Sequence, residues 1–351
     1  MNQNEYIEGL KKCKTHISFI IPVYNTNSIM LERCIKSVLN LGCNDIEIVI
    51  INDGSTEIET INVLKAFSKY NNIIVINKDN EGPAIARNVG IESSNGEYIV
   101  FLDSDDMIET NRFKKVLQIL KKYPDTDVLF HSFDIIDENN SIVKIGYNTN
   151  DILSFSCLSS NKNILKKTID CLGFDNAVIW SKIYKKTAIS NVRFDSQLKY
   201  CEDNIFNISL TKNCNKFLGI YINAYIHTIN PQSLCHKYNP NASKDFSVTI
   251  EKMKEQLETS SDINQFYRIV VFHFYVRHVL ALQVFNKQNK SNFIFCCKQA
   301  KEILYSESYK QAFNNIKLTG LSVREKVVYK LLKRRLFWVA YKVYFFHLQK
   351  R

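Results

Sequence analysis

The first 122 residues alternate between short apolar runs and segments with helical spacing. Each apolar run has a length that suits a buried strand, and the runs are residues 17–23, 46–52, 73–77 and 98–103. The segments with helical spacing are residues 28–40, 57–69, 83–94 and 110–122. Continuously apolar strands are typical of a sheet that is covered on both faces. Because the strands are separated by crossover helices, the pattern predicts an α/β fold with a doubly wound, mostly parallel sheet.

The regular alternation of predicted strands and helices ends after residue 124. We expect strands at 127–133, 141–147 (after a turn at Glu138-Asn139-Asn140) and 217–229, and helices at 161–171, 177–188 and 202–212. After Pro240 the pattern is helical to the end of the chain, with few Gly or Pro residues. We therefore predict one domain over residues 1–240 and a helical C-terminal region over residues 241–351.

Basic residues are concentrated in the last part of the sequence. The net charge is +11, and residues 321–351 contribute +8 of it through nine Lys and Arg residues against one Glu. Residues 1–320 are therefore close to balanced, at +3. A nucleic-acid-binding protein needs a basic face on its folded body, so we expect no nucleic acid partner.

The sequence gives no indication of export. Residues 1–14 are polar and lack the apolar run of a signal peptide. The ten Cys residues include no C-x-x-C pair, which favours reduced thiols over a disulfide framework. No run of 18 apolar residues occurs, so we expect no spanning helix and a cytoplasmic location.

Polar turns follow three of the four predicted strands. They are Pro22-Val23-Tyr24-Asn25, Asn52-Asp53-Gly54-Ser55 and Asp103-Ser104-Asp105-Asp106. In an open parallel sheet the ligand binds beyond the carboxyl ends of the strands, so these turns should converge on one crevice. Several carboxylates in one place repel each other unless a cation is present, and Mg²⁺ or Mn²⁺ accepts oxygen ligands together with substrate phosphates. The alternative is a solvated loop that caps the next helix.

A further motif lies at the start of the helix predicted over 83–94. Residues Asn80 to Asn88 combine a Gly turn, a helix N-terminus that favours an anion, and Arg87 one turn into the helix. Arg87 would contact a phosphate or a buried carboxylate, or else form an ordinary surface ion pair.

Taken in order, the motifs PVYN, NDGS, N-x-G-x-x-x-A-R-N and D-S-D-D resemble those of the family-two glycosyltransferases of the GT-A fold. Residues 179–184 are similar to the W-x-K-L-Y stretch of that family. Arg193-Phe194 and residues 202–206 are similar to its R-F and E-D-x-x-F stretches. The resemblance covers residues 17–235. It implies a GT-A type sheet with a nucleotide-sugar half at about 15–106 and an acceptor and catalytic half at about 107–240.

The resemblance also implies roles for single residues in donor binding. Asp53 would recognise the base, and Pro22 and Tyr24 would form the floor of the nucleotide site. Arg87 would brace this pocket. Asp103 would face the ribose or the donor sugar.

The resemblance implies that Asp105 holds a metal ion, Mn²⁺ or Mg²⁺. The sequence departs from the family where a Y-x-R stretch is common, because His227 replaces the Arg. His227 would contact a phosphate, or His227 or His236 would complete the metal shell. The alternative is a structural role, which is common for a single His near a strand end.

The resemblance implies that Asp203 is the general base, with Glu202 beside it to orient or tune it. An inverting transfer is a single displacement, so one carboxylate must accept the proton of the attacking hydroxyl. The alternative is that both acids only stabilise the start of a helix, where negative charge is favourable.

The C-terminal tail has an amphipathic pattern. On one helix Val328, Leu332, Leu336, Val339 and Val343 share a face, and Lys326, Lys330, Lys333 and Arg334 share another. A basic, aromatic-rich amphipathic helix resembles an interfacial membrane segment. It would place the protein on the anionic inner face of the cytoplasmic membrane. The alternative is a helix that packs on the body.

We therefore expect a glycosyltransferase, either a hexosyl- or an N-acetylhexosaminyltransferase. It would move a sugar from a nucleotide-diphosphate donor, by resemblance a UDP-sugar, onto a glycan or lipid-linked glycan with inversion, in cell-surface polysaccharide biosynthesis. A nicotinamide-dependent oxidoreductase is disfavoured because no G-x-G-x-x-G follows the first strand. The remaining alternative is a catalytically silent sugar-nucleotide-binding protein or a membrane-associated scaffold.

Overall fold

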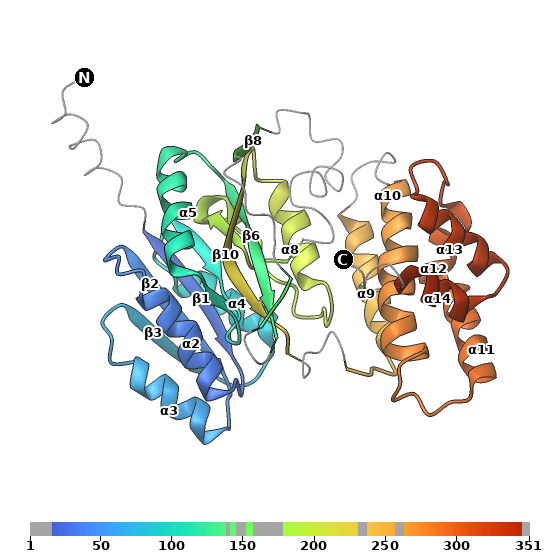
Figure 1. Cartoon of the computed structure of the whole chain (residues 1–351), viewed down its shortest axis with the longest axis horizontal. Helices are drawn as coiled ribbons and strands as arrows, with labels where there is room; N and C mark the ends of the chain where they lie inside the picture. Colours follow the sequence, from blue (N-terminus) through green and yellow to red (C-terminus); the bar gives the residue numbers. More distant parts are fainter. Residues whose placement is uncertain are drawn as a thin grey trace. The chain divides into compact units, whose positions relative to one another are not determined.

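The computed structural model describes residues 16–137, 141–144, 152–156, 178–230, 237–256 and 263–345. The chain divides into two compact units (Figure 1). The first unit consists of Met1–Ser159, Ile169–Ser196 and Ser209–Asn230, and the second of Ser160–Thr168, Gln197–Ile208 and Pro231–Arg351. The division at residue 240 stays a prediction.

Four parallel strands form one half of the sheet in the first unit. They lie in the order β3-β2-β1-β4, and their bounds are Ile17–Val23 (β1), Ile46–Asp53 (β2), Ile73–Lys78 (β3) and Tyr98–Phe101 (β4). In the central strands β1, β2 and β4 almost every residue is buried, as expected for strands that are covered on both faces.

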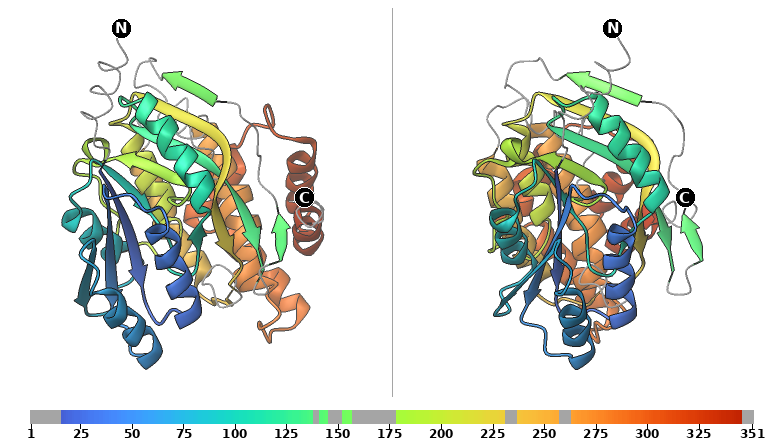
Figure 2. Two further views of the ribbon diagram at one scale, coloured as in Figure 1. Left: turned by 60° about the vertical axis from the view of Figure 1, so that its left-hand side comes forward. Right: turned by 90° about the vertical axis from the view of Figure 1, so that its left-hand side faces the viewer.

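Helices cover both faces of these strands. They are Ser28–Leu39 (α2), Ile58–Phe67 (α3), Pro83–Ser93 (α4) and Thr110–Lys122 (α5). Apolar residues of α2, α3 and α5 pack with Phe19, Ile21 and Val100 on one face, whereas Ala86 of α4 packs with Val49 and Ile51 on the other. Figure 2 shows the blue helices and the teal α4 on opposite sides of the sheet.

The other half of the sheet mixes strand directions. β9 (Lys182–Lys185) is antiparallel to both β4 and β6 (Val128–Ile136). β10 (Lys216–Thr228) is parallel to β6 and antiparallel to β5 (Met107–Ile108). β7 (Ile142–Lys144) and β8 (Ile152–Ser156) extend the sheet beside β6 and β10. The predicted α/β class with a mostly parallel sheet is confirmed.

One of the predicted helices is wrong. Residues 177–188 were expected to be helical, but residues 182–185 form β9 and only Lys186–Ile189 (α7) is helical. The edges of β4 and β6 need a hydrogen-bonding partner, and β9 supplies it with Ile183 and Tyr184 buried. The helix predicted at 161–171 and the turn at 138–140 lie outside the described residues, whereas α8 (Glu202–Thr211) agrees with prediction.

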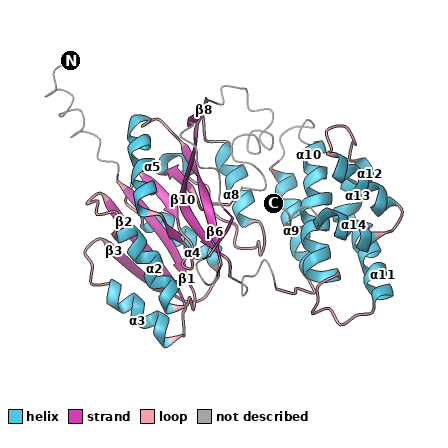
Figure 3. Ribbon diagram, viewed as in Figure 1, coloured by secondary structure: helices cyan, strands magenta, loops and turns pink. Residues whose placement is uncertain are grey.

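The second unit is helical beyond residue 240, as predicted (Figure 3). Its helices are Ala242–Glu255 (α9), Ile263–Arg268 (α10), Phe293–Leu304 (α11), Glu307–Asn315 (α12), Val323–Lys333 (α13) and Phe337–Phe345 (α14). Between α10 and α11 lies a π-helix, Ile269–Val284 (η1). Most of its side chains are buried, so it forms the core on which the other helices pack.

The single amphipathic tail helix predicted from the sequence is wrong. The segment forms two helices, α13 and α14, separated by a turn in which Arg335 has a φ of 60°. Val328 and Leu332 are buried, but Leu336 is 45% exposed and Val339 40% exposed. The turn breaks the predicted apolar stripe because α14 buries Phe337, Ala340 and Tyr344 instead. Among the described residues, no helix combines the length and the hydropathy needed to cross a membrane.

Candidate active site

The acidic loop begins where β4 ends. Strand pairing stops at Phe101, earlier than predicted, although the Leu102 amide still donates to the Ile20 carbonyl at 3.0 Å. The Asp106 amide then donates to the Asp103 carbonyl at 3.0 Å, which closes a tight turn. The hydroxyls of Ser104 and Thr26 lie 2.7 Å apart and tie this turn to the one after β1. The Asn25 amide also donates to the Ser55 hydroxyl at 3.1 Å, so the turn after β1 is hydrogen-bonded to the turns after both β2 and β4.

Arg87 pairs with Asp103 at the start of the acidic loop. Its guanidinium lies 3.1 Å from Oδ1 of Asp103 and stacks on the Phe194 ring at 5.6 Å. Arg87 is 6% exposed, so the surface ion pair considered from the sequence is wrong. The side chain of Asn88 accepts from the Phe194 amide at 2.8 Å and donates to its carbonyl at 2.9 Å. The R-F segment is therefore fixed to α4 beside the acidic loop.

Asp53 organises the loop that leads into α4. Its carboxylate accepts hydrogen bonds from the Lys78 ammonium at 2.7 Å and from the amides of Glu81 and Gly82 at 3.0 and 2.8 Å. Asp53 is 3% exposed. The next residue, Gly54, has a φ of 71°, and a Cβ there would lie 2.7 Å from the Asn80 amide nitrogen. Only glycine lets the two loops approach this closely.

The turn after β1 presents an aromatic ring. Tyr24 is 54% exposed, and Pro22 beside it is partly exposed. The side chain of Asn25 accepts from the amides of Thr56 and Glu57 at 2.8 and 3.0 Å, which fixes this turn to the start of α3. The Tyr24 ring is thus an accessible surface on a rigid turn.

Asp105 is the carboxylate of the loop with the least charge compensation. Asn230 donates to its Oδ2 at 3.0 Å, and Arg33 donates to its backbone carbonyl at 3.1 Å. Burial, together with the negative charge of Asp103, raises the pKa of Asp105 above its ordinary value. A cation at this carboxylate would relieve both effects.

Asp106 lies beneath the loop and holds β10. It is fully buried, and it accepts from the Tyr225 hydroxyl at 2.6 Å, from the Thr228 amide at 2.7 Å and from Nδ1 of His227 at 3.1 Å. Burial raises the pKa of Asp106 to about 6, although the hydrogen bond and charge of His227 oppose it. Burial would lower the pKa of His227, but Asp106 and its acidic neighbours outweigh that effect and raise it.

Trp180 covers this pair of residues on β10. Its ring stacks on Tyr225 at 4.9 Å and on His227 at 5.3 Å, with interplanar angles of 18° and 7°. Phe133 contacts Trp180 edge-on at 4.8 Å. His227 is therefore held both by a carboxylate and by an aromatic face, which leaves its ring little freedom to rotate.

Glu202 and Asp203 lie in the first turn of α8. The preceding residue, Cys201, has a φ of 60°, and its carbonyl accepts from the amides of Asn204 and Ile205 at 3.1 and 3.2 Å. Both acids are partly exposed. They belong to the second compact unit, whereas the residues around Asp105 belong to the first.

Residues 18–187 match the protein family described as Glycosyl transferase family 2. The chain carries a glycosyltransferase family 2 domain. The family resemblance expected from the sequence is confirmed.

Curated relatives share this domain. The chain is 26% identical over 261 residues to glycosyltransferase GlyA of Streptococcus pneumoniae, and the match covers 69% of this chain but only 34% of GlyA. It is 27% identical over 210 residues to the poly(ribitol-phosphate) beta-N-acetylglucosaminyltransferase TarP of Staphylococcus aureus, a match that covers 57% of this chain and 59% of TarP. The chain thus spans about a third of the first relative and less than two thirds of the second.

A solved structure shows the same fold across most of the chain. Residues 1–349 of S. aureus TarS, crystallised with UDP-GlcNAc, superpose with a TM-score of 0.64 at 18% identity. The superposition covers 96% of this chain and 92% of that one. The GT-A type fold with C-terminal helices, predicted from the sequence, is confirmed.

The residues of the glycosyltransferase domain fit a site in which the protein supplies some ligands of a divalent cation and the substrate supplies the others. Over the described ranges, no three His, Cys, Asp or Glu side chains form a ready-made metal site. Mg²⁺-type ions usually take only one or two carboxylates and complete their shell with phosphates and water. Asp105, with its raised pKa, suits that role. His236 lies outside the described residues.

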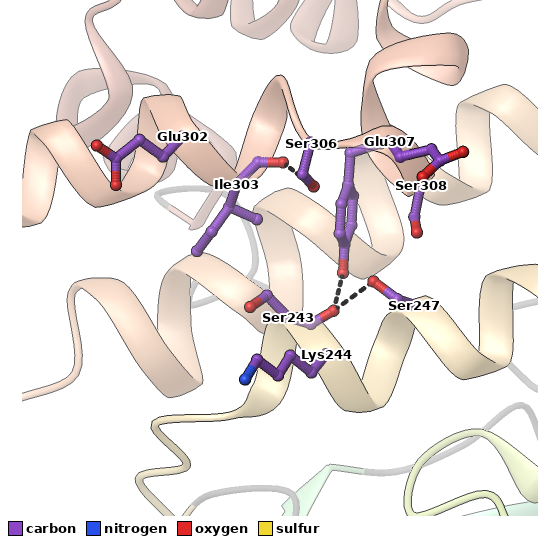
Figure 4. A pocket seen from close by; sticks show the side chains of 9 residues that line it. Ser243, Lys244, Ser247, Glu302, Ile303, Ser306, Glu307 and Ser308 are labelled. Carbon is purple, nitrogen blue, oxygen red and sulfur yellow. Dashed lines mark hydrogen bonds between the residues drawn. The ribbon is translucent and has the colours of Figure 1, made fainter.

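A pocket within the second unit is separate from these residues. It has a volume of about 330 Å³ and lies between α9 and the α11–α12 segment (Figure 4). The Tyr309 and Ser247 hydroxyls both donate to the Ser243 carbonyl there, at 3.0 and 2.8 Å. None of the predicted site residues lines this pocket.

Proposed function

We propose that this protein transfers a sugar from a UDP-sugar donor to a glycan or lipid-linked glycan acceptor, with inversion at the anomeric carbon, in cell-surface polysaccharide biosynthesis. The observation that supports this most is the acidic loop after β4. There Asp103 is paired with Arg87, while the partly buried Asp105 accepts a hydrogen bond from Asn230 and has a pKa raised by burial and by the charge of Asp103. A UDP-linked N-acetylhexosamine is the first donor to test, because TarS was crystallised with UDP-GlcNAc and TarP is named for transfer of N-acetylglucosamine.

We assign the donor-binding roles to the first unit. The exposed ring of Tyr24, with Pro22, would stack against the base. Asp53 would recognise the base through Oδ2, which accepts only from the Gly82 amide among the described residues, while the hydrogen bonds of Oδ1 to Lys78 and Glu81 keep the loop before α4 in shape. Arg87 would hold Asp103 toward the ribose or sugar.

We propose that Asp105 and His227 hold the Mn²⁺ or Mg²⁺ ion. When Nδ1 of His227 donates to Asp106, Nε2 of the neutral ring carries the free lone pair, as in many metal sites where a carboxylate orients a metal-binding His. A bound ion would stabilise the negative charge of the departing diphosphate. Asp106 and Trp180 would act through His227 by fixing the orientation of its ring.

We propose that Asp203 is the general base. As the acceptor oxygen forms its bond to the anomeric carbon, the bond from that carbon to the diphosphate oxygen breaks, and the hydroxyl proton passes to the Asp203 carboxylate. Glu202 would raise the basicity of Asp203 by its negative charge. A lipid-linked acceptor would further require that the protein binds peripherally at the inner face of the cytoplasmic membrane.

The decisive experiment combines a donor screen with one variant. Release of nucleoside diphosphate from a panel of nucleotide sugars, with and without Mn²⁺, identifies the donor. In titration calorimetry, Asp105→Asn should lose the metal-dependent part of donor affinity. The matched control is Asp125→Asn, because Asp125 is a surface residue paired with Lys216. No metal-dependent turnover of any donor would favour the silent binding protein or scaffold, and unchanged affinity of Asp105→Asn would remove this residue from the metal site.

A further inference from the structure

The first turn of α11 exposes three consecutive large apolar side chains. Phe293 is 58% exposed, Ile294 81% and Phe295 52%. The helix is otherwise packed normally, with Cys296, Ala300, Ile303 and Leu304 buried. Single exposed apolar residues are common on protein surfaces, but a contiguous group indicates an interaction site.

A second helix extends this group. The Trp338 ring of α14 is 43% exposed and meets the Phe293 ring edge-on at 6.3 Å. The Phe285 ring lies 6.5 Å from that of Phe293 and 5.6 Å from that of Tyr341, which links the start of α11 to the middle of α14. We call the four exposed side chains the apolar patch: Phe293, Ile294, Phe295 and Trp338.

The surroundings of the apolar patch are basic. No Asp or Glu occurs in residues 263–301 or 326–351, the two segments that supply the patch. Lys342 lies with its ammonium 5.3 Å from the Trp338 ring and 5.7 Å from the Tyr341 ring. Lys287 and Lys290 are exposed on the loop that leads into α11. A partner for this surface must therefore combine an apolar interior with negative charge.

We propose that the apolar patch is a docking surface for a bilayer that contains anionic phospholipid. Phe and Ile side chains enter the boundary of the acyl chains, and a Trp ring is favoured at the level of the headgroups. Lys side chains beside them extend to the lipid phosphates. This inference deepens the peripheral membrane binding proposed above and locates it at α11 and α14 in place of the tail stripe, whose Val328 and Leu332 are buried.

Flotation of the full-length protein with vesicles tests this surface. The vesicles are phosphatidylcholine with or without phosphatidylglycerol, at low and high salt. Ile294→Glu should reduce binding to the anionic vesicles at least about tenfold, because it replaces a deeply inserted apolar side chain with a charge. An acid in the first turn of a helix is favourable, so this variant should remain folded.

The matched control is Val323→Glu. Val323 is 79% exposed and also lies in the first turn of a helix, so the substitution makes the same change in charge. The neighbouring residue Arg324 stacks on Tyr344 of α14. Tyr344 lies six residues after Trp338 in that helix, which separates the two residues by about 9 Å along the helix axis. This control should float like wild type.

Two results would overturn the proposal. One is an equal loss of flotation in Val323→Glu, and the other is wild-type flotation of Ile294→Glu. If Ile294→Glu floats like wild type and its oligomeric state changes in sedimentation, the patch is a contact between copies of the chain. Donor hydrolysis is measured in parallel, without vesicles. Flotation without hydrolysis in any condition would reject the proposed function and leave the docking surface standing.

Discussion

Nδ1 of His227 lies 3.1 Å from Oδ2 of Asp106, a carboxylate that is fully buried. The contact joins the acidic loop after β4 to the end of β10. The hydroxyl of Tyr225 and the amide of Thr228 bind the same carboxylate, so three groups of one strand converge on it. Asp106 therefore sets both the position of β10 and the orientation of the His227 ring.

Asp106→Asn should lower Mn²⁺ affinity or Mn²⁺-dependent turnover by about 10–100-fold, the usual effect of losing a carboxylate behind a metal-binding His. The Thr228 amide binds Oδ1 of Asp106 and the Tyr225 hydroxyl binds Oδ2. In the variant the amide oxygen can replace Oδ1, and the Tyr225 hydroxyl can turn to accept from the new NH2 group, so the fold should persist. Titration of Mn²⁺ against activity measures the change, and Asp125→Asn serves as the control. An unaltered Mn²⁺ dependence would mean that His227 is structural.

Asp203→Asn should leave donor affinity unchanged and lower kcat by about 10²–10⁴-fold, since proton transfer to a general base has that effect. Glu202→Gln should lower kcat by a smaller factor, because the charge of Glu202 affects the reaction only through Asp203. Steady-state kinetics combined with donor titration separate the two effects. If Glu202→Gln were the more damaging variant, the roles of the two acids would be exchanged.

Gly54→Ala should destabilise the fold more than Gly42→Ala. Both glycines have a positive φ, 71° and 62°, so both substitutions incur the cost of a left-handed residue, about 1–2 kcal/mol. A Cβ at Gly42 meets nothing within 4 Å, whereas at Gly54 it lies 2.7 Å from the Asn80 amide nitrogen. Urea unfolding should show an additional loss of at least about 1 kcal/mol for Gly54→Ala. Equal losses would mean that the loop at Asn80 moves freely.

Glu325 should make the stability of the protein depend on pH in acid. Burial alone would raise the pKa of Glu325, but hydrogen bonds from Arg268 and Ser322 outweigh it and hold the pKa below its ordinary value. The unfolded chain therefore binds this proton more readily. The contribution to stability is complete above the unfolded pKa of about 4.3 and is lost as the pH falls through the lower folded value.

Glu325→Gln should accordingly lower the free energy of unfolding at pH 7 and reduce its decline between about pH 5 and 3. Urea titrations at several pH values measure both. Glu302→Gln is the control, because Glu302 is exposed and its ion pair is a long one, 3.9 Å from Lys298 on the same helix. A Glu325→Gln curve parallel to wild type would show that Glu325 keeps the same pKa in the folded and unfolded states.

The first half of the fold could be predicted because its strands are uniformly apolar and its helices regular. β9 could not, for a local physical reason. Lys182 begins this strand and is 2% exposed, with its ammonium donating to the Val178 carbonyl at 2.6 Å. A buried Lys in a four-residue strand removes the apolar pattern on which strand prediction depends. In the tail, the apolar spacing continues through the sequence, but the left-handed backbone at Arg335 ends one helix before the next begins.

Some residues of the candidate site could likewise be predicted from the sequence, and others could not. Asp53, Arg87, Asp103 and Asp105 could be selected from the sequence, because each stands in a short motif at a strand end or helix start. The contributions of Asp106, Trp180 and Arg33 could not, since they depend on contacts with β10. Arg33, for example, donates to the Thr228 hydroxyl at 2.7 Å across 195 positions of sequence. Spacing along the chain contains no information about such contacts.

The bond between Asp106 and Tyr225 also sets an order of events during synthesis, because the two residues are 119 positions apart. At about 5–20 residues per second, roughly 6–24 s pass on the ribosome between the addition of Asp106 and that of Tyr225. During that interval β1 to β4 can already pair, but the acidic loop still lacks the strand that fixes it. The nascent chain can thus form the parallel half of its sheet first, and its acidic loop acquires the contacts of β10 only after translation has passed Thr228.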